Sequence, residues 1–488
     1  MTNSSWKTEG LIWAPIIIRY ALWNLMIYMT DKWDLSLAMA AAIVNSFWGI
    51  TDMLQIVMKF FLDAFVGNFR MALFFGSACS IGLCLLSSSV EMNEIDLYFP
   101  IALVVLSLGI SSGESISLDE LTQQGDNDLA TEEDPELARG GQIELAIEEG
   151  PDLAREGDRE LATEEDTNNL ARFRSCAIVC MAAATLVFAS YNPGQARGSH
   201  QNTAFTDAYS RATKEWKLRK GETCSDEKKK VSGVHGLFML RVVSAVGDTY
   251  FLEQADTMNS MIHHDTFILQ LWHQFALFIF STIYTEIVKR INRTDLKKYA
   301  GCAGLSVSMV LAIFCCFTAA KVEVERLNRV KSNRVVERYD EYSDEYKNVI
   351  DMTTFWMVPQ YTLLGGLEGI SSESIDILFS NYPLEPMDPY LNHLATGVHG
   401  LGNIGNILVV FILGKASAWR DGTSWFQDTL DKSRLDKYYW SLAAVSIVNL
   451  VFYTILYYWH DLRNHVSELR LSIVSSNTQG REAADHVP

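Results

Sequence analysis

A few ionisable side chains lie inside long apolar stretches of the sequence. The first is Glu368, in the run FWMVPQYTLLGGLEG, where glycines 365, 366 and 369 surround it. An ionisable group deep in an apolar segment is costly and usually faces a cavity or a partner. A carboxylate in that position is suited to reversible protonation, so we expect Glu368 to be the central group of a solute or proton site. The alternative is a carboxylate tied to a neighbouring helix for structural reasons.

Four further ionisable residues are candidates for the same site: Arg19, Arg241, Asp248 and His399. The two arginines could pair with Glu368 or bind an anion, and Arg241 could equally extend to the membrane surface. Asp248 is a candidate for a second protonatable carboxylate. His399 could titrate at mildly acidic pH, although a hydrogen-bonded packing histidine is the alternative.

Enzyme and metal chemistry have no support in the sequence. It contains no phosphate-binding loop, nucleophile elbow or deaminase signature, so we expect no enzymatic activity. Six of the eight cysteines lie in apolar runs, and no cysteine spacing suggests zinc. The run His263-His264-Asp265 falls in a predicted interhelical loop. We therefore expect no metal and no other cofactor.

The negative charge of the chain is concentrated in one stretch. The 488 residues are 49% hydrophobic and carry a formal net charge of −19. Residues 112–171 hold 19 acidic and 3 basic side chains and so account for −16 of it. The rest is nearly neutral and contains the long apolar runs. This excludes a disordered chain, a disulfide scaffold and a basic nucleic-acid binder. It indicates a multi-pass membrane protein with one acidic insertion.

The apolar runs predict an all-α protein with about eleven transmembrane helices. A span needs about 20 apolar residues as a helix, and several such spans form a bundle because only helices and closed barrels satisfy the backbone in lipid. The predicted spans are 11–30, 37–65, 71–90, 97–113, 175–191, 233–252, 266–288, 299–320, 352–378, 393–415 and 438–459.

The acidic insertion interrupts this series where a twelfth span would be expected. Leu-Ala pairs recur in it every eight residues from Leu129 to Ala162. Eight is neither a heptad nor two turns of 3.6, so the apolar stripe drifts around a helix. We expect a solvated, mostly disordered loop. A partner-binding acidic segment, a recently acquired tandem repeat and a misassembled gene remain alternatives, and protein partners are unknown.

The distribution of basic residues suggests a domain organisation. The loops 196–232 and 289–298 are rich in lysine and arginine, which places them in the cytoplasm. We expect an N-terminal bundle at 1–191, a basic linker at 192–232, a C-terminal bundle at 233–460 and a cytoplasmic tail at 461–488.

Several motifs resemble known transporters. The stretch FFLDAFVGNFR, with Asp63, Gly67 and Arg70, resembles the signature between helices two and three of the major facilitator superfamily. The runs FWMVPQYTLLGGLEG, GDTYFLEQADTMN and WFQDTLDKSRLDKYYW resemble the plant nitrate and peptide transporter family, within the proton-dependent oligopeptide transporters. The resemblance covers nearly the whole chain except 112–171. It implies a two-bundle, alternating-access fold with a solute site between the halves.

The same resemblance implies roles for individual residues. Glu368 matches a glutamate that meets the substrate amine in peptide transporters, and Tyr361 matches a cavity-lining position. Pro359, with the glycines that follow, could loosen its helix for gating. Asp63, Gly67 and Arg70 would form a charge clamp between two transport states.

Two departures from the family concern proton coupling. The family has a glutamate-rich signature in its first helix, but 11–30 contains no Asp or Glu, and Arg19 stands where the signature's arginine would be. A lysine usual in the fourth helix aligns with Glu114.

We expect a secondary transporter of nitrate or a di- or tripeptide, driven by protons, in the plasma membrane or the vacuolar membrane. An uncoupled facilitator of the same fold and a transport-inactive product are the alternatives. We expect a solute, protons and the lipid bilayer as partners, and no nucleic acid.

Overall fold

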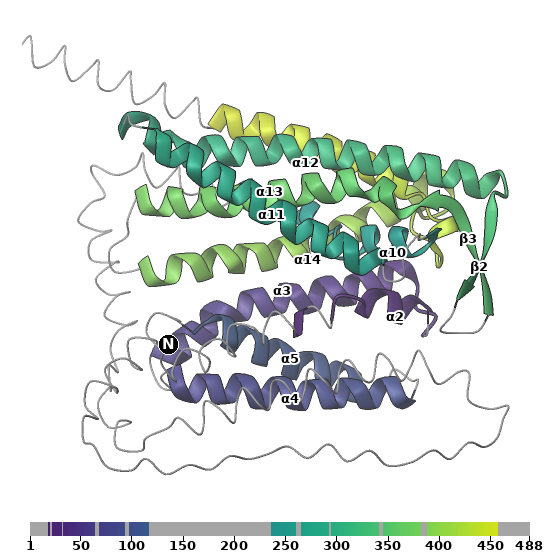
Figure 1. Ribbon diagram of the computed structural model, residues 1–488, viewed down its shortest axis with the longest axis horizontal. Helices are drawn as coiled ribbons and strands as arrows, with labels where there is room; N and C mark the ends of the chain where they lie inside the picture. Colours follow the sequence, from purple (N-terminus) through teal and green to yellow (C-terminus); the bar gives the residue numbers. More distant parts are fainter. Residues whose placement is uncertain are drawn as a thin grey trace, which may run out of the picture. The chain divides into compact units, whose positions relative to one another are not determined.

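The structure is a computed structural model that consists mainly of long helices (Figure 1). It describes residues 18–19, 22–31, 33–63, 68–92, 97–116, 236–259, 265–291, 294–340, 345–381 and 388–456. Nearly all of the acidic insertion, the predicted span 175–191, the basic loop 196–232 and the tail 461–488 lie outside these described residues.

The chain divides into two compact units. Unit 1 comprises Met1–Leu22, Phe65–His200 and Glu337–Lys347, and unit 2 comprises Trp23–Ala64, Gln201–Val336 and Asn348–Pro488. The predicted division into bundles at 1–191 and 233–460 stays a prediction.

Helices α4 (Asn68–Met92) and α5 (Tyr98–Glu114) pack against each other in unit 1. Their contact depends on glycine. A Cβ atom on Gly82 would lie 2.6 Å from Cγ of Leu106, and one on Gly109 would lie 2.6 Å from Sγ of Cys79. Small residues at such positions let two apolar helices approach closely where no hydrophobic effect drives them together.

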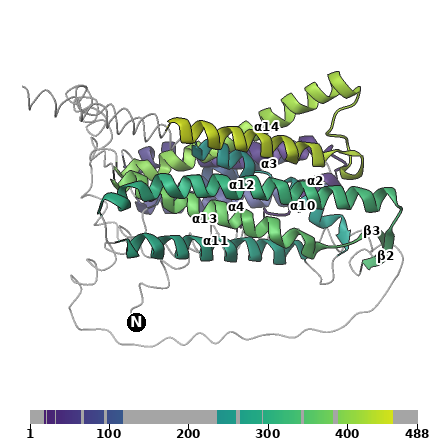
Figure 2. The same ribbon diagram turned by 90° about the horizontal axis from the view of Figure 1, so that it is seen from above.

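Helix α13 (Val358–Asn381) packs in unit 2 between α11 (Asp265–Arg290) and α12 (Thr294–Lys331), as Figure 2 shows from above. A Cβ atom on Gly365 would lie 2.7 Å from the backbone oxygen of His273. The glycines beside Glu368 therefore bring α13 against the backbone of α11. The predicted span 352–378 began too early, because the helix starts at Val358.

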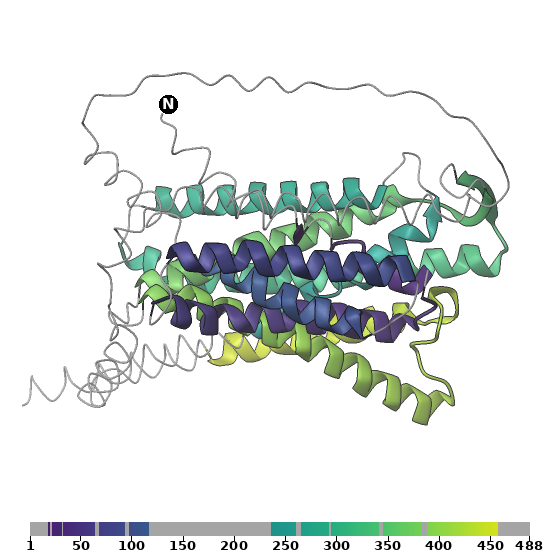
Figure 3. The same ribbon diagram turned by 90° about the horizontal axis from the view of Figure 1, so that it is seen from below.

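Helices α3 (Leu37–Phe61) and α14 (Asp388–Asp421) form a second close pair in unit 2. A Cβ atom on Gly400 would meet the backbone oxygen of Gly49. The far end of α14 runs obliquely to the C-terminal helix Leu435–Leu456, which is yellow in Figure 3. Of the predicted first span, the described part includes residues 18–19, which are helical, and the short helix α2 (Leu25–Asp31).

The predicted span 233–252 is a broken helix. A first helix covers 236–244, turns follow at 245–249, and α10 (Tyr250–Asp256) continues the chain. The break is tight: the N–H of Gly247 donates to the Ser244 carbonyl at 2.8 Å, and the N–H of Val246 donates to the Val243 carbonyl at 3.2 Å. Discontinuous helices of this kind form solute and ion sites in transporters.

A small sheet accompanies the helices. Strands β1 (Met258–Asn259), β2 (Val335–Asp340) and β3 (Glu345–Thr353) form it, with β3 in the middle, and the 3-10 helix η2 (Thr354–Met357) leads into α13. Strand β1 pairs with β3 in parallel. The sequence analysis listed helical spans only and did not include this sheet.

Six helices in the described part of the chain are long and apolar enough to cross a membrane: Leu37–Phe61, Arg70–Ser89, Thr266–Arg290, Tyr299–Lys331, Tyr390–Asp421 and Leu435–Leu456. Helix α5, with 17 residues, is a shorter apolar helix. Large apolar side chains are exposed on α11, including Phe275 and Phe278. This outward apolar face is what contact with lipid requires.

Candidate solute and proton site

The broken helix places three polar side chains of unit 2 together. Arg241 and Ser244 lie in the last turn of the helix 236–244, and Asp248 lies in the turns that follow. The carbonyl oxygen of Ser244 accepts a hydrogen bond from the N–H of Gly247, and its hydroxyl donates to Glu368. The unwinding therefore presents a cation, a hydroxyl and a carboxylate in eight residues.

Glu368 of α13 lies against this segment. Nη1 of Arg241 donates to Oε1 of Glu368 at 3.1 Å and to Oγ of Ser244 at 3.0 Å. The Ser244 hydroxyl itself donates to Oε1 of Glu368. The expected pairing of Arg241 with Glu368 is thus present, and one oxygen of the carboxylate is occupied by two donors.

His273 of α11 meets the other oxygen of the same carboxylate. Its Nε2 lies 3.1 Å from Oε2 of Glu368, and its side chain is only 4% exposed. Neither Nδ1 nor Nε2 makes a well-aligned hydrogen bond with a described residue, although Nε2 is at ion-pair distance from Glu368. His273 was not among the residues expected from the sequence, although it is an ionisable residue in the middle of a predicted span, which is the signal that identified Glu368.

Asp248 and Asn403 complete the surroundings of Arg241. Oδ2 of Asp248 lies 3.6 Å from Nη2 of Arg241, and Nε of Arg241 donates to Oδ1 of Asn403 at 3.2 Å. Asn403 of α14 is buried, and His399 lies one turn before it, half-buried. His399 is within electrostatic reach of Arg241 and Glu368. We call Arg241, Asp248, His273 and Glu368 the central cluster.

Tyr361 lies beside the central cluster, on the same helix as Glu368. It is fully buried, and its ring makes edge contacts with His273 at 6.3 Å and with Phe251 at 6.0 Å. The Tyr361 hydroxyl has no hydrogen-bond partner in the described part of the chain. A buried, unsatisfied hydroxyl next to an ionic cluster is available to a ligand or a water molecule.

The remaining predicted residues lie elsewhere. Arg19, in unit 1, forms an ion pair at 2.7 Å with Glu114, the last residue of α5. Asp63 accepts a hydrogen bond from the Tyr390 hydroxyl at 2.7 Å and forms an ion pair with Lys59 at 3.2 Å. Their predicted roles in substrate binding and gating stay predictions.

Of the other three members of the predicted gating set, Arg70 and Pro359 belong to the described part of the chain. Arg70 lies exposed in the first turn of α4, and Gly67 lies outside the described residues. Pro359 is the second residue of α13, and proline fits the first turn of a helix without breaking it. The helix continues from there to Asn381, and the predicted gating role of Pro359 stays a prediction.

A second ionic cluster of unit 2 is centred on a buried arginine. Arg326 of α12 is completely buried, and its guanidinium contacts Glu323 at 2.8 and 2.9 Å, Asp431 at 2.6 Å and the backbone oxygen of Leu430 at 3.2 Å. Glu323 also accepts from Gln254 of α10, whose Oε1 accepts from the Tyr439 hydroxyl. We call Glu323, Arg326 and Asp431 the Arg326 cluster.

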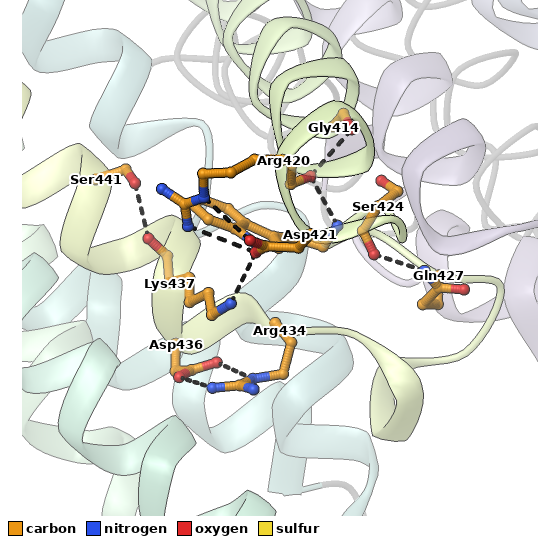
Figure 4. A network of polar contacts seen from close by, with 11 residues as sticks. Gly414, Arg420, Asp421, Ser424, Gln427, Arg434, Asp436, Lys437 and Ser441 are labelled. Carbon is orange, nitrogen blue, oxygen red and sulfur yellow. Dashed lines mark hydrogen bonds and ion pairs between the residues drawn. The ribbon is translucent and has the colours of Figure 1, made fainter.

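The motif from Trp425 to Trp440 builds the loop that this cluster holds. Figure 4 shows its other polar contacts. Arg434 forms two hydrogen bonds with Asp436, both at 2.9 Å, and Lys437 reaches Asp421 at 3.1 Å. Asp421 also accepts from the Trp425 indole at 3.1 Å. The motif therefore orders the connection between α14 and the last helix.

A metal site finds no support in the geometry. Among the described residues, no group of three or more His, Cys, Asp or Glu side chains could hold a metal ion. The chemistry available at the central cluster is instead the binding of charged groups and of protons in a largely buried setting.

No family model matches the chain. It is 28% identical to the protein NRT1/PTR FAMILY 5.5 of Arabidopsis thaliana, over 93% of this chain and 96% of that protein. Its structure is similar to that of the POT family transporter PepTSo, with a TM-score of 0.59, 9% identity and coverage of 93% of this chain and 98% of that one. A peptide transporter POT in complex with sulfate is similar as well, with a TM-score of 0.58, 10% identity and coverage of 93% and 94%.

These similarities confirm the resemblance to the plant nitrate and peptide transporter family and the transporter fold of the major facilitator type. Proteins that the chain resembles are transporters and not enzymes. The chain is an integral membrane protein that crosses the bilayer several times.

Proposed function

We propose that the chain is a secondary transporter that moves nitrate or a di- or tripeptide by alternating access, coupled to protons. The central cluster is the observation that carries this proposal. Four ionisable side chains meet at a broken helix, largely buried, with Glu368 in the middle. Buried ionisable groups in membrane helices typically belong to a solute path or a proton relay.

The solute classes come from the relatives. The plant relative carries nitrate and peptide transport in its family name, and the similar solved structure is a peptide transporter crystallised with sulfate. The central cluster can serve either class, because it offers a guanidinium to an anion and carboxylates to an amine. The fold alone does not choose between the two.

An uncoupled facilitator is a second candidate function, favoured by one specific observation. The first predicted span has no carboxylate, and Arg19 is already paired with Glu114. A facilitator would use the central cluster for solute recognition only. Voltage clamping separates the two functions, since the uptake of a neutral peptide together with a proton carries inward current and facilitated uptake does not.

A substitution at Glu368 tests the proposal. Wild-type protein and the Glu368→Gln variant would be expressed in oocytes, and uptake of ¹⁵N-nitrate and of labelled dialanine would be measured at about pH 5.5 and about pH 7.5, on either side of the range where a proton site must load and release. We expect the wild type to be stimulated by acid and Glu368→Gln to lose that stimulation.

Glu373→Gln is the matched control, because Glu373 lies on the same helix and accepts hydrogen bonds from Ser281 and Thr285 of α11. Unchanged uptake and pH dependence in Glu368→Gln would refute the role of Glu368. No uptake of either solute by wild-type protein at the cell surface would favour a transport-inactive product. A fluorescent tag would show whether the protein resides in the plasma membrane or the vacuolar membrane.

A further inference from the structure

We propose that His273 holds the coupling proton, which is bound and released at its Nδ1 atom. This inference rests on the proposed function and assigns its proton step to one atom. The position of the residue carries the argument: His273 faces Glu368 from a different helix, is nearly inaccessible to solvent, and has its Nε2 atom 3.1 Å from Oε2 of Glu368. Neither ring nitrogen makes a well-aligned hydrogen bond with a described residue.

The charges of the central cluster require one more proton. Arg241 is always a cation, whereas Asp248 and Glu368 are anions when ionised. With a neutral His273 the cluster therefore carries one net negative charge, and a single added proton makes it neutral. An uncompensated buried charge is strongly disfavoured, so the cluster is a site that takes up one proton.

The other titratable groups around His273 do not replace it. Asp248 faces Arg241, Tyr361 and Cys315 are neutral acids when buried, and His399 of α14 lies on the Arg241 side of the cluster. His273 is the histidine that contacts the carboxylate directly. An imidazole is also the side chain whose ordinary titration range matches a proton gradient near neutral pH.

The contacts of Glu368 determine which atom receives the proton. Oε1 accepts hydrogen bonds from Arg241 and Ser244, and because these two donors face both of its lone pairs, Oε1 is not the atom that binds the added proton. Oε2 lies 3.1 Å from Nε2 of His273, so a small rotation of the imidazole lets this contact hold one hydrogen, whichever of the two atoms owns it. An added proton must then reside on Nδ1 of the imidazole, both in the imidazolium–carboxylate form and in the neutral form.

Nδ1 is suited to release the proton as well. No described side chain or backbone group accepts a hydrogen bond from Nδ1. A proton on this atom can therefore leave without breaking a hydrogen bond within the protein. A close contact between α11 and α13 lies beside it, where Gly365 meets the His273 backbone. In this proposal, a movement of α11 relative to α13 exposes Nδ1, so that the proton leaves without breaking the Arg241–Glu368 pair.

Two measurements on proteoliposomes separate the proton step from solute movement. The first is exchange of labelled solute at equal pH on both sides, which needs no net proton movement. The second is accumulation of ¹⁵N-nitrate or labelled dialanine against its own gradient, with the voltage clamped to zero. With one proton per solute, a gradient of one pH unit supports about tenfold accumulation, since a tenfold ratio corresponds to one such unit.

His273→Gln keeps an amide donor for Glu368 but cannot take the added proton. We expect this variant to retain exchange and to lose accumulation. His273→Lys keeps a cation beside Glu368 under all conditions, and we expect exchange that is independent of pH and again no accumulation. His393→Gln, which removes a partly exposed histidine near the start of α14, is the matched control and should accumulate like the wild type.

The outcomes are distinct. If the wild type shows neither exchange nor accumulation, the proposed function itself fails. If the wild type accumulates solute and His273→Gln does so equally, the function stands and the proton assignment is overturned. Loss of exchange in both His273 variants also overturns the assignment, because His273 would then act on solute binding or on the structure. His273→Lys decides the question if His273→Gln fails to fold.

Discussion

Replacing Arg326 by methionine should destabilise unit 2 by about 3 kcal/mol or more, the usual cost of removing one partner of a buried ion pair. Arg326 and Glu323 are both completely inaccessible to solvent. The substitution leaves the Glu323 carboxylate buried with only the amide of Gln254 as a donor among the described residues. Asp431 is 52% exposed, so water can solvate it and it adds little to the cost.

A second substitution should recover most of this loss. In the double variant Glu323→Gln with Arg326→Met, the buried charge is absent, and replacing both partners of a buried pair is often nearly neutral. What remains is the loss of hydrogen bonds to Asp431 and Leu430, each worth about 1 kcal/mol. We therefore expect the stability order wild type, double variant, Arg326→Met.

The assay heats tagged protein in detergent to a series of temperatures. At each temperature, size-exclusion chromatography measures the fraction of the protein that still elutes as a monodisperse peak. Arg420→Met is the matched control, because Arg420 pairs with Asp421 while 66% exposed and such surface pairs contribute at most about 1 kcal/mol. The reasoning is refuted if Arg326→Met unfolds together with the wild type, or if the double variant is no more stable than Arg326→Met.

Two further predictions concern helix packing and the Arg19 pair. Gly365→Ala should destabilise the protein by about 1–3 kcal/mol, because its Cβ would press on the α11 backbone. Gly397→Ala is the control, because no atom of the described residues lies within 4 Å of the added Cβ and alanine favours the helix. The unfolding temperature of this variant should be unchanged or slightly higher. Arg19→Glu should reduce solute uptake by opposing Glu114, and the reciprocal pair Arg19→Glu with Glu114→Arg should restore it. Equal uptake by the single and double variants, at equal surface expression, would show that the ion pair has no role.

The positions of most helices follow from hydropathy, because length and apolar content are what the bilayer selects. The broken helix before α10 was predicted as one continuous span for the same reason: hydropathy averages over residues 245–249 and does not register a local change in hydrogen bonding. Gly247, followed by Asp248 and Thr249, was the available signal, since these residues favour turns over helix interiors.

Individual site residues were predictable where their chemistry conflicts with their surroundings. Glu368 and Arg241 were found in this way, and the structure pairs them. His273 was missed although it is an ionisable residue inside a predicted span, because a neutral histidine is compatible with an apolar helix and its signal is weaker than that of a carboxylate. Its partner lies 95 positions later on another helix, and only the packing of α11 against α13 brings the two together.

The loop from Trp425 to Trp440 has a consequence for how such proteins are recognised. Within the described part of the chain, its conspicuous side chains contact Asp421, α10 and α12 rather than the central cluster. The most recognisable stretch of the chain therefore serves the assembly of the last helix, and it carries no information about the transported solute. Grouping proteins by this signature sorts them by architecture, whereas sorting them by what they carry would require comparing the few side chains around Glu368.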